Sequence, residues 1–161
     1  MKKKVILAYS GGLDTSVCVK WLAEEKHLEV ICFSADIGQG VNKSLLTKRA
    51  KASGAARLYV KDLRVEFIRD FIFQTLKAGA VYESKYYLAT ALSRPLIAKA
   101  LVEVAQNEKA SYIAHGCTGK GNDQVRFEVS VAALAPELDV IAPLREWDLS
   151  SREEEVEYAR K

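Results

Sequence analysis

The chain has few cysteines, no long apolar run and little net charge. Its three cysteines, Cys18, Cys32 and Cys117, are odd in number and lack C-x-x-C spacing. We therefore expect reduced thiols and a cytoplasmic location. No apolar stretch reaches membrane-spanning length, and none near the basic start fits a secretory apolar core, so we expect no membrane partner. The formal net charge of +3 is too small to predict a nucleic-acid partner.

What is present is typical of a globular α/β protein. The 161 residues, 49% of them apolar and 28% charged, suit one domain or slightly more. Short apolar runs alternate with amphipathic segments, which predicts a mostly parallel sheet with helices on both faces. We expect strands at 5–8, 28–33, 58–60, 111–115 and 140–142. We expect helices at 14–26 and 42–53, one after Asp62 with a stripe of Phe67, Ile68, Phe71, Ile72 and Leu76, one starting at Ser93 and Pro95, and one from Asn122.

A glycine-containing loop joins the first strand to the first helix. It has the sequence Ser10-Gly11-Gly12-Leu13-Asp14-Thr15-Ser16. It is neither a Walker A loop nor G-x-G-x-x-G. Glycines permit close backbone approach, and the first amides of a helix have no intrahelical partners, so the loop predicts a polyphosphate site. A merely structural strand-to-helix turn is the alternative.

This loop resembles the pyrophosphate-binding loop of the ATP pyrophosphatase superfamily, whose members adenylate a substrate oxygen and release pyrophosphate. The resemblance implies a Rossmann-like fold of the adenine nucleotide alpha hydrolase type. By itself the loop does not choose among GMP synthetase, NAD synthetase, asparagine synthetase, tRNA-modifying enzymes and argininosuccinate synthase.

A second polar loop follows the fourth expected strand. Residues 115–128 read His-Gly-Cys-Thr-Gly-Lys-Gly-Asn-Asp-Gln-Val-Arg-Phe-Glu, with three glycines within six residues. On the expected helix Asn122 and Arg126 share one face, where an amide and a guanidinium can hold a carboxylate. Taken singly, Asn122 could equally be an N-cap and Arg126 a surface charge. His115, a lone histidine at a strand end, is expected to be structural rather than catalytic.

The second loop resembles the signature of the argininosuccinate synthase family. Further matches are 34–39, 82–86, 93–95 and 140–143, so the resemblance spans 4–147. It implies a ligase of arginine biosynthesis: citrulline is adenylated by ATP with Mg²⁺, pyrophosphate leaves, and aspartate displaces AMP. It also implies a homotetramer at full length. Residues 1–147 would form the nucleotide-binding domain and 148–161 the start of the connection to a C-terminal synthetase domain, so we expect a fragment that lacks the oligomerisation region.

The resemblance also assigns roles to individual residues. Asp14 is a candidate near the metal, either directly or through water, or else a helix-start residue favoured by the dipole. We assign no general base. The implied aspartate-binding residues are Thr118, Asn122 and Asp123, and the implied citrulline-binding residues are Tyr86, Asn122 and Arg126. The implied ATP-binding residues are Ala8, Tyr9, Ser10, Gly11, Gly12, Leu13, Asp14, Thr15, Ser16, Ala35 and Gly116.

One departure and two alternatives accompany this assignment. Ala91 stands where some relatives carry a serine that touches citrulline. A stand-alone ATP-binding or regulatory module without turnover is the main alternative. A tRNA sulfur-transfer or amidotransfer relative is the other, but sulfur transfer needs paired reactive cysteines and only Cys117 lies near the loops.

Overall fold

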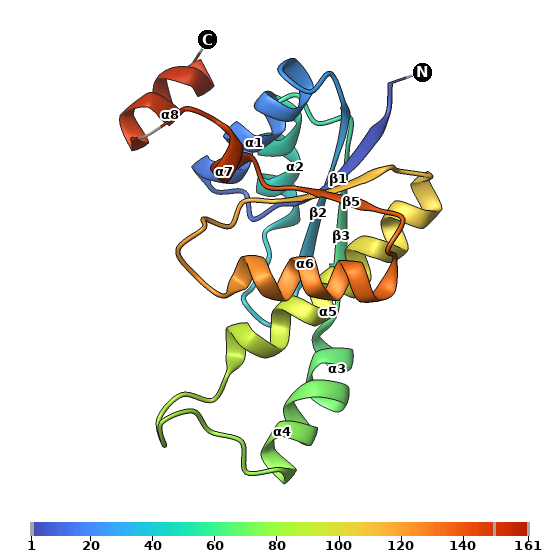
Figure 1. Ribbon diagram of the computed structural model, residues 1–161, viewed down its shortest axis with the longest axis vertical. Helices are drawn as coiled ribbons and strands as arrows, with labels where there is room; N and C mark the ends of the chain where they lie inside the picture. Colours follow the sequence, from blue (N-terminus) through green and yellow to red (C-terminus); the bar gives the residue numbers. More distant parts are fainter. Residues whose placement is uncertain (1, 150, 161) are drawn as a thin grey trace.

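A five-stranded parallel sheet forms the centre of the computed structural model, which describes residues 2–149 and 151–160 (Figure 1). The order across the sheet is β3-β2-β1-β4-β5, and every pairing is parallel. Ile6 in the middle of β1 lies beside Ile31 of β2 and Ile113 of β4. The strands are β1 (Lys4–Ala8), β2 (Glu29–Asp36), β3 (Arg57–Asp62), β4 (Tyr112–His115) and β5 (Asp139–Ile141). The predicted α/β class and parallel sheet are confirmed.

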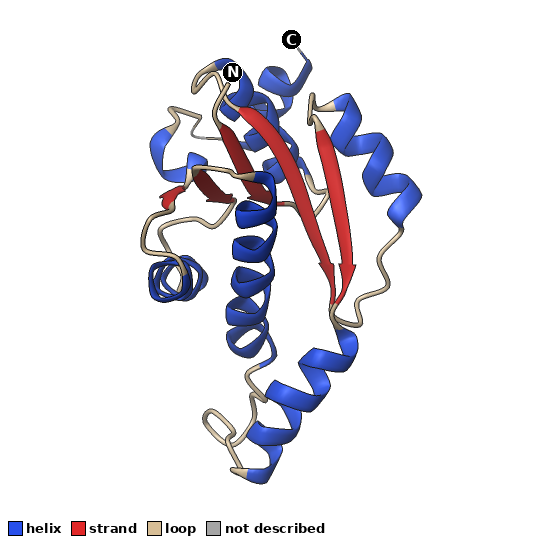
Figure 2. Cartoon of the chain, turned by 90° about the vertical axis from the view of Figure 1, so that its right-hand side faces the viewer, coloured by secondary structure: helices blue, strands red, loops and turns tan. Residues whose placement is uncertain are grey.

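Helices cover both faces of the sheet because the central strands are apolar on both sides. On one face, α5 (Ala89–Glu108) and α6 (Asp123–Leu134) pack with Leu101 and Phe127 against Ile6. On the other face, α1 (Leu13–Glu24) and α2 (Lys43–Ala52) pack with Leu22 and Leu46 against the opposite sides of β1 and β2. Figure 2 shows the length of α5 lying along the sheet. The two cores hold the carboxyl ends of β1, β2 and β4 at one edge.

A helical arm extends past the carboxyl end of β3, away from the sheet (Figures 1 and 2). It consists of α3 (Arg64–Glu66), the π-helical turn η1 (Phe67–Ile72) and α4 (Phe73–Lys77). The predicted apolar stripe is only partly correct here. Phe67 is buried, but Ile68 is 46% and Leu76 58% exposed, because a π turn shifts the side-chain positions that follow it.

The start of α5 differs from the sequence-based expectation. The helix begins at Ala89, four residues before Ser93, and Leu88 precedes it in a left-handed conformation at φ +59°. Ser93 lies inside the helix, where its hydroxyl donates to the Thr90 carbonyl oxygen at 3.1 Å. Pro95 is therefore an internal proline, which removes one helical hydrogen bond rather than marking the helix start.

The last residues fold back onto α1. Trp147 follows α7 (Pro143–Glu146) and meets Trp21 edge-on at 6.4 Å between ring centroids. From α8 (Arg152–Arg160), the Tyr158 hydroxyl donates to Glu24 at 3.0 Å. The sequence has capping-box spacing from Ser150 to Glu153 and from Ser151 to Glu154. Ser151 caps α8 by accepting the Glu154 N–H at 3.2 Å, whereas Ser150 lies outside the described residues. Within the described part of the chain, no helix is long and apolar enough to cross a membrane.

Candidate functional site

A cavity of about 610 Å³ opens at the carboxyl edge of the sheet. In parallel α/β sheets this edge is where ligands bind, at the point where the strand order reverses. The loops after β1, β2 and β4 all reach it, with Arg49 of α2 and Arg94 of α5 on its sides. Four of the nine residues predicted from Ala8 to Ser16 line the cavity directly, and so do the predicted Ala35 and Gly116. The four are Ala8, Tyr9, Ser10 and Thr15.

The backbone of the first loop needs glycine at position 11. Gly11 has φ +79°, and a Cβ atom there would lie 2.3 Å from Leu46 Cδ2. Its carbonyl oxygen accepts a 2.8 Å hydrogen bond from Arg49 Nη1. The tight turn is thus held against α2 by two of its side chains, Leu46 through packing and Arg49 through its hydrogen bond. No pattern in the sequence marks Arg49, which lines the cavity.

Hydroxyl groups stabilise the loop from within. Ser10 Oγ lies 3.1 Å from Thr15 Oγ1 and accepts the Gly12 N–H at 3.3 Å, and Tyr9 Oη lies 3.1 Å from Ser16 Oγ. Gly12 is the N-cap of α1 and has no side chain to cap it. The first amides of α1 are consequently available to an anion, in the arrangement that favours bound phosphate.

Asp14 lies outside the cavity lining and beside α8. Glu155 of α8 is its neighbour, and burial followed by the nearby Asp14 carboxylate raises the pKa of Glu155. Carboxylate oxygens are suitable Mg²⁺ ligands. Among the described residues, no three acidic, histidine or cysteine side chains gather into a metal site.

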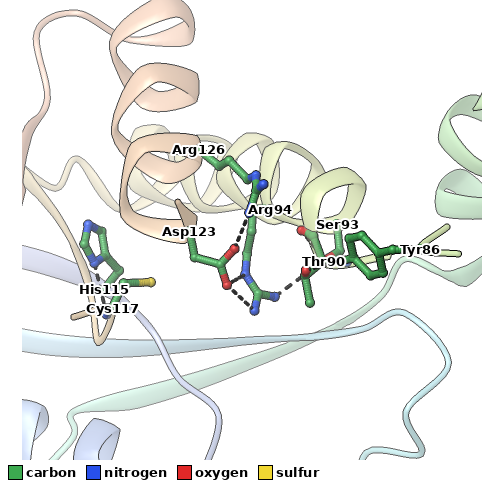
Figure 3. Close-up of polar contacts among 8 residues, drawn as sticks. All are labelled: Tyr86, Thr90, Ser93, Arg94, His115, Cys117, Asp123 and Arg126. Atoms are coloured by element: carbon green, nitrogen blue, oxygen red, sulfur yellow. Dashed lines mark hydrogen bonds and ion pairs between the residues drawn. The ribbon is translucent and has the colours of Figure 1, made fainter. Parts of the chain in front are cut away.

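The second loop leads into a cluster of three charged side chains (Figure 3). Asp123 at the start of α6 accepts from Arg94 Nε at 3.0 Å and from Arg126 Nη1 at 2.8 Å. Its carboxylate thus joins α5 to α6 by pairing with the guanidinium groups of Arg94 and Arg126. Asn122 and Thr118 are exposed beside it, and the Asn122 carbonyl accepts the Arg126 N–H at 3.1 Å.

Tyr86 lies near this cluster, in the segment 78–88 that connects α4 to α5. Its hydroxyl accepts the Thr90 N–H at 3.0 Å and contacts Thr90 Oγ1. The Thr90 hydroxyl and N–H lower the pKa of Tyr86, and the Arg126 charge adds to the effect. Thr90, which precedes Ala91 in the chain, thus holds the Tyr86 hydroxyl.

His115 is buried beneath the second loop. Its ring stacks on Phe127 at 5.6 Å, and its Nδ1 accepts the Cys117 N–H at 3.3 Å. Its Nε2 lies 3.4 Å from Glu128 Oε1, which also pairs with Arg145 at 2.6 Å. An accepting Nδ1 places the proton of neutral imidazole on Nε2, facing Glu128. Burial outweighs the attraction of Glu128 and lowers the pKa of His115.

This lowered pKa predicts a loss of stability in weak acid. Below about pH 6.5 the unfolded chain takes up a proton at this histidine that the folded chain resists, so the free energy of unfolding falls, by at most about 1.4 kcal/mol per pH unit. Urea unfolding of wild type and His115→Gln between pH 7.5 and 5.5 measures the difference. The variant should show the shallower pH dependence, and His27→Gln is the matched control. Equal slopes for wild type and His115→Gln would contradict the assignment.

Comparison with known proteins decides the family. Residues 4–161 match the family model described as "Arginosuccinate synthase N-terminal HUP domain". The chain belongs to the argininosuccinate synthase family. It is 62% identical over 156 residues to the argininosuccinate synthase of Pelotomaculum thermopropionicum, covering 97% of this chain and 39% of that protein. It is 60% identical over 160 residues to the chloroplastic argininosuccinate synthase of Arabidopsis thaliana, covering 99% of this chain and 32% of that protein.

The chain spans about a third to two fifths of the length of the argininosuccinate synthases that it matches. Among solved structures, a 4-thiouridine synthetase in complex with RNA and ATP is similar in fold, with a TM-score of 0.65 at 18% identity over 98% of this chain and 40% of that one. At that identity the likeness supports the fold alone.

Arg94 and Gln39 also line the cavity, and both lie in segments that carry the family resemblance, but no local motif marks them as site residues.

Proposed function

We propose that this chain provides the ATP- and aspartate-binding part of an argininosuccinate synthase. The observation that carries the proposal is the convergence of two glycine loops on one cavity, with the Arg94–Asp123–Arg126 cluster beside it. In this proposal the free amides of α1 and the hydroxyls of Ser10 and Thr15 hold the pyrophosphate that leaves. Magnesium bound with ATP would supply further charge neutralisation near Asp14.

The proposed substrate positions come from the family resemblance. Tyr86, Asn122 and Arg126 would orient citrulline so that its ureido oxygen attacks the α-phosphate, while Thr118, Asn122 and Asp123 would bind aspartate. The new oxygen–phosphorus bond forms as the bond to pyrophosphate breaks, and the aspartate amine then displaces AMP. Catalysis of this kind depends on positioning, for which about 7–11 kcal/mol is available in favourable intramolecular cases. No side chain is needed as a general base in the first step.

We also propose a cytoplasmic location, and a homotetramer for the full-length protein. The three cysteines, Cys18, Cys32 and Cys117, are all free thiols in the structure, which agrees with a reducing compartment. The tetramer follows from the family resemblance.

Binding of Mg-ATP is the first prediction of this proposal. Calorimetric titration of the folded chain should give one site, with no binding of GTP at the same concentrations. A pyrophosphate-release assay with ATP, citrulline and aspartate, each omitted in turn, then separates the synthase from the stand-alone module. Release that requires ATP and citrulline but not aspartate supports adenylation of citrulline. Mg-ATP binding without release under any combination supports a binding module, and a folded chain that binds no Mg-ATP contradicts both.

A further inference from the structure

The loop after β2 is closed by the side chain of Gln39. Its Nε2 donates to the Ala35 carbonyl oxygen at 2.6 Å, and its Oε1 accepts the Ile37 N–H at 2.8 Å. Ala35, Ile37 and Gln39 all line the cavity. One carboxamide therefore satisfies two backbone groups at the cavity wall, an acceptor and a donor two residues apart.

These two backbone groups match one edge of a purine base. A partner that satisfies both must present a donor and an acceptor side by side. The 6-amino group and N1 of adenine have this pattern, whereas O6 and N1–H of guanine have the reverse. The Gln39 carboxamide has the same donor and acceptor order as adenine. Apolar side chains of Leu45 and Leu46 line the same cavity and offer surface to a flat ring.

The Gln39 side chain has room to leave this position. It is exposed at the surface, between Gly38 at φ +113° and Gly40 at φ +74°. Nothing lies within 4 Å of a Cβ atom placed at either glycine, so packing does not hold this segment. Asp36 Oδ1 accepts the Gly38 N–H at 2.9 Å and keeps the turn closed independently of Gln39.

We propose that Gln39 occupies the adenine position when no nucleotide is bound and is displaced when the nucleotide binds. The proposal rests on the proposed ATP-binding function and adds a residue that sets nucleotide affinity. Adenine must compete with the carboxamide for the Ala35 carbonyl and the Ile37 N–H. The larger the fraction of molecules in which Gln39 occupies these two groups, the weaker the measured affinity for the nucleotide. A base without the adenine pattern gains no hydrogen bonds from the displacement.

The alternative is that Gln39 only supports the turn. The two roles predict opposite changes in affinity when its polar atoms are removed. If Gln39 competes with adenine, its loss tightens ATP binding. If it supports the turn that forms the base site, its loss loosens the site and weakens ATP binding.

Gln39→Met tests this, because methionine keeps the length of the side chain but neither donates nor accepts strongly. Calorimetric titration should give about threefold to tenfold tighter binding of Mg-ATP and of adenosine than in wild type, as expected for the loss of two modest competing hydrogen bonds. Binding of inorganic pyrophosphate should stay unchanged, because the phosphate loop lies after β1. Gln74→Met on the exposed arm is the matched control and should change neither ligand.

A weaker or unchanged Kd for Mg-ATP in Gln39→Met, with wild-type unfolding behaviour, overturns the proposal. A second measurement is nuclear magnetic resonance of the wild-type side-chain amides, in which the Gln39 amide protons should shift when adenosine is added and remain in place when pyrophosphate is added. If the folded wild type binds neither Mg-ATP nor pyrophosphate, the proposed function fails. If the wild type binds both and Gln39→Met shows no tightening, only the role of Gln39 fails.

Discussion

Gly11→Ala is expected to abolish measurable Mg-ATP binding and to lower the free energy of unfolding by about 2–4 kcal/mol. Two costs add at this position. A non-glycine residue at φ +79° is strained, and its Cβ would lie 2.3 Å from Leu46 Cδ2. Relief requires movement of the loop or of α2, and either movement disturbs the Arg49 hydrogen bond to the Gly11 carbonyl. Urea unfolding and calorimetric titration measure the two effects.

Gly54→Ala is the matched control. Gly54 has φ +92°, but nothing lies within 4 Å of a Cβ placed there, and it ends α2 away from the cavity. It should show the backbone strain without the steric clash, a loss of about 1–2 kcal/mol, and unchanged Mg-ATP binding. If Gly11→Ala were no more destabilising than Gly54→Ala and still bound Mg-ATP, the close packing of the loop against α2 would have no functional role.

Arg126→Ala should weaken the use of citrulline by about 10- to 100-fold, the range expected for the loss of a charged hydrogen bond. The guanidinium is held by Asp123 at 2.8 Å and reaches toward Tyr86, whose pKa its charge helps to lower. It lies outside the cavity lining, so the Kd for Mg-ATP should change by less than about twofold. The measurement is the KM for citrulline in the pyrophosphate-release assay, made in a chain of full family length that carries these residues.

Arg69→Ala provides the comparison for this variant. Arg69 pairs with Asp70 on the arm in a similar guanidinium–carboxylate contact, but it is a surface pair. Its loss should leave both citrulline and ATP use unchanged, as is usual for exposed ion pairs. Equal losses in ATP binding and citrulline use for Arg126→Ala would instead indicate that the Asp123 pair stabilises the whole site.

The periodicity of the sequence was sufficient to predict the sheet and the edge of the sheet at which the two loops meet. The apolar runs at β1, β2 and β4 are short and continuous, as in strands buried on both faces, and their polar loops follow each strand end. Because parallel strands place these ends together, the meeting of the loops at one cavity follows from topology. The individual binding roles of Tyr86, Thr118, Asn122, Asp123 and Arg126 remain predictions.

Features that depend on distant contacts were not predictable. The predicted start of α5 was wrong. Leu88, just before the helix, adopts a left-handed conformation that its residue type does not favour, and Ser93 and Pro95, which are typical of a helix start, lie inside the helix. The π turn after Glu66 likewise changes the period on which the expected stripe depended. Arg49 bonds to a backbone group that folding brings near, and a sequence pattern contains no direct signal for such a contact. Gln39 bonds to backbone groups two and four residues away, in a turn that no local motif marks.

The contact between the two glycine loops has an evolutionary consequence. A Cβ atom at Gly116 would lie 3.1 Å from Thr15 Cγ2, and Thr15 is itself buried and bonded to Ser10. A larger residue at 116 therefore presses on the Thr15 methyl group, and a smaller residue at position 15 would relieve this contact. Substitutions at these two positions should arise in pairs, so that the first and second loops diverge together in related sequences.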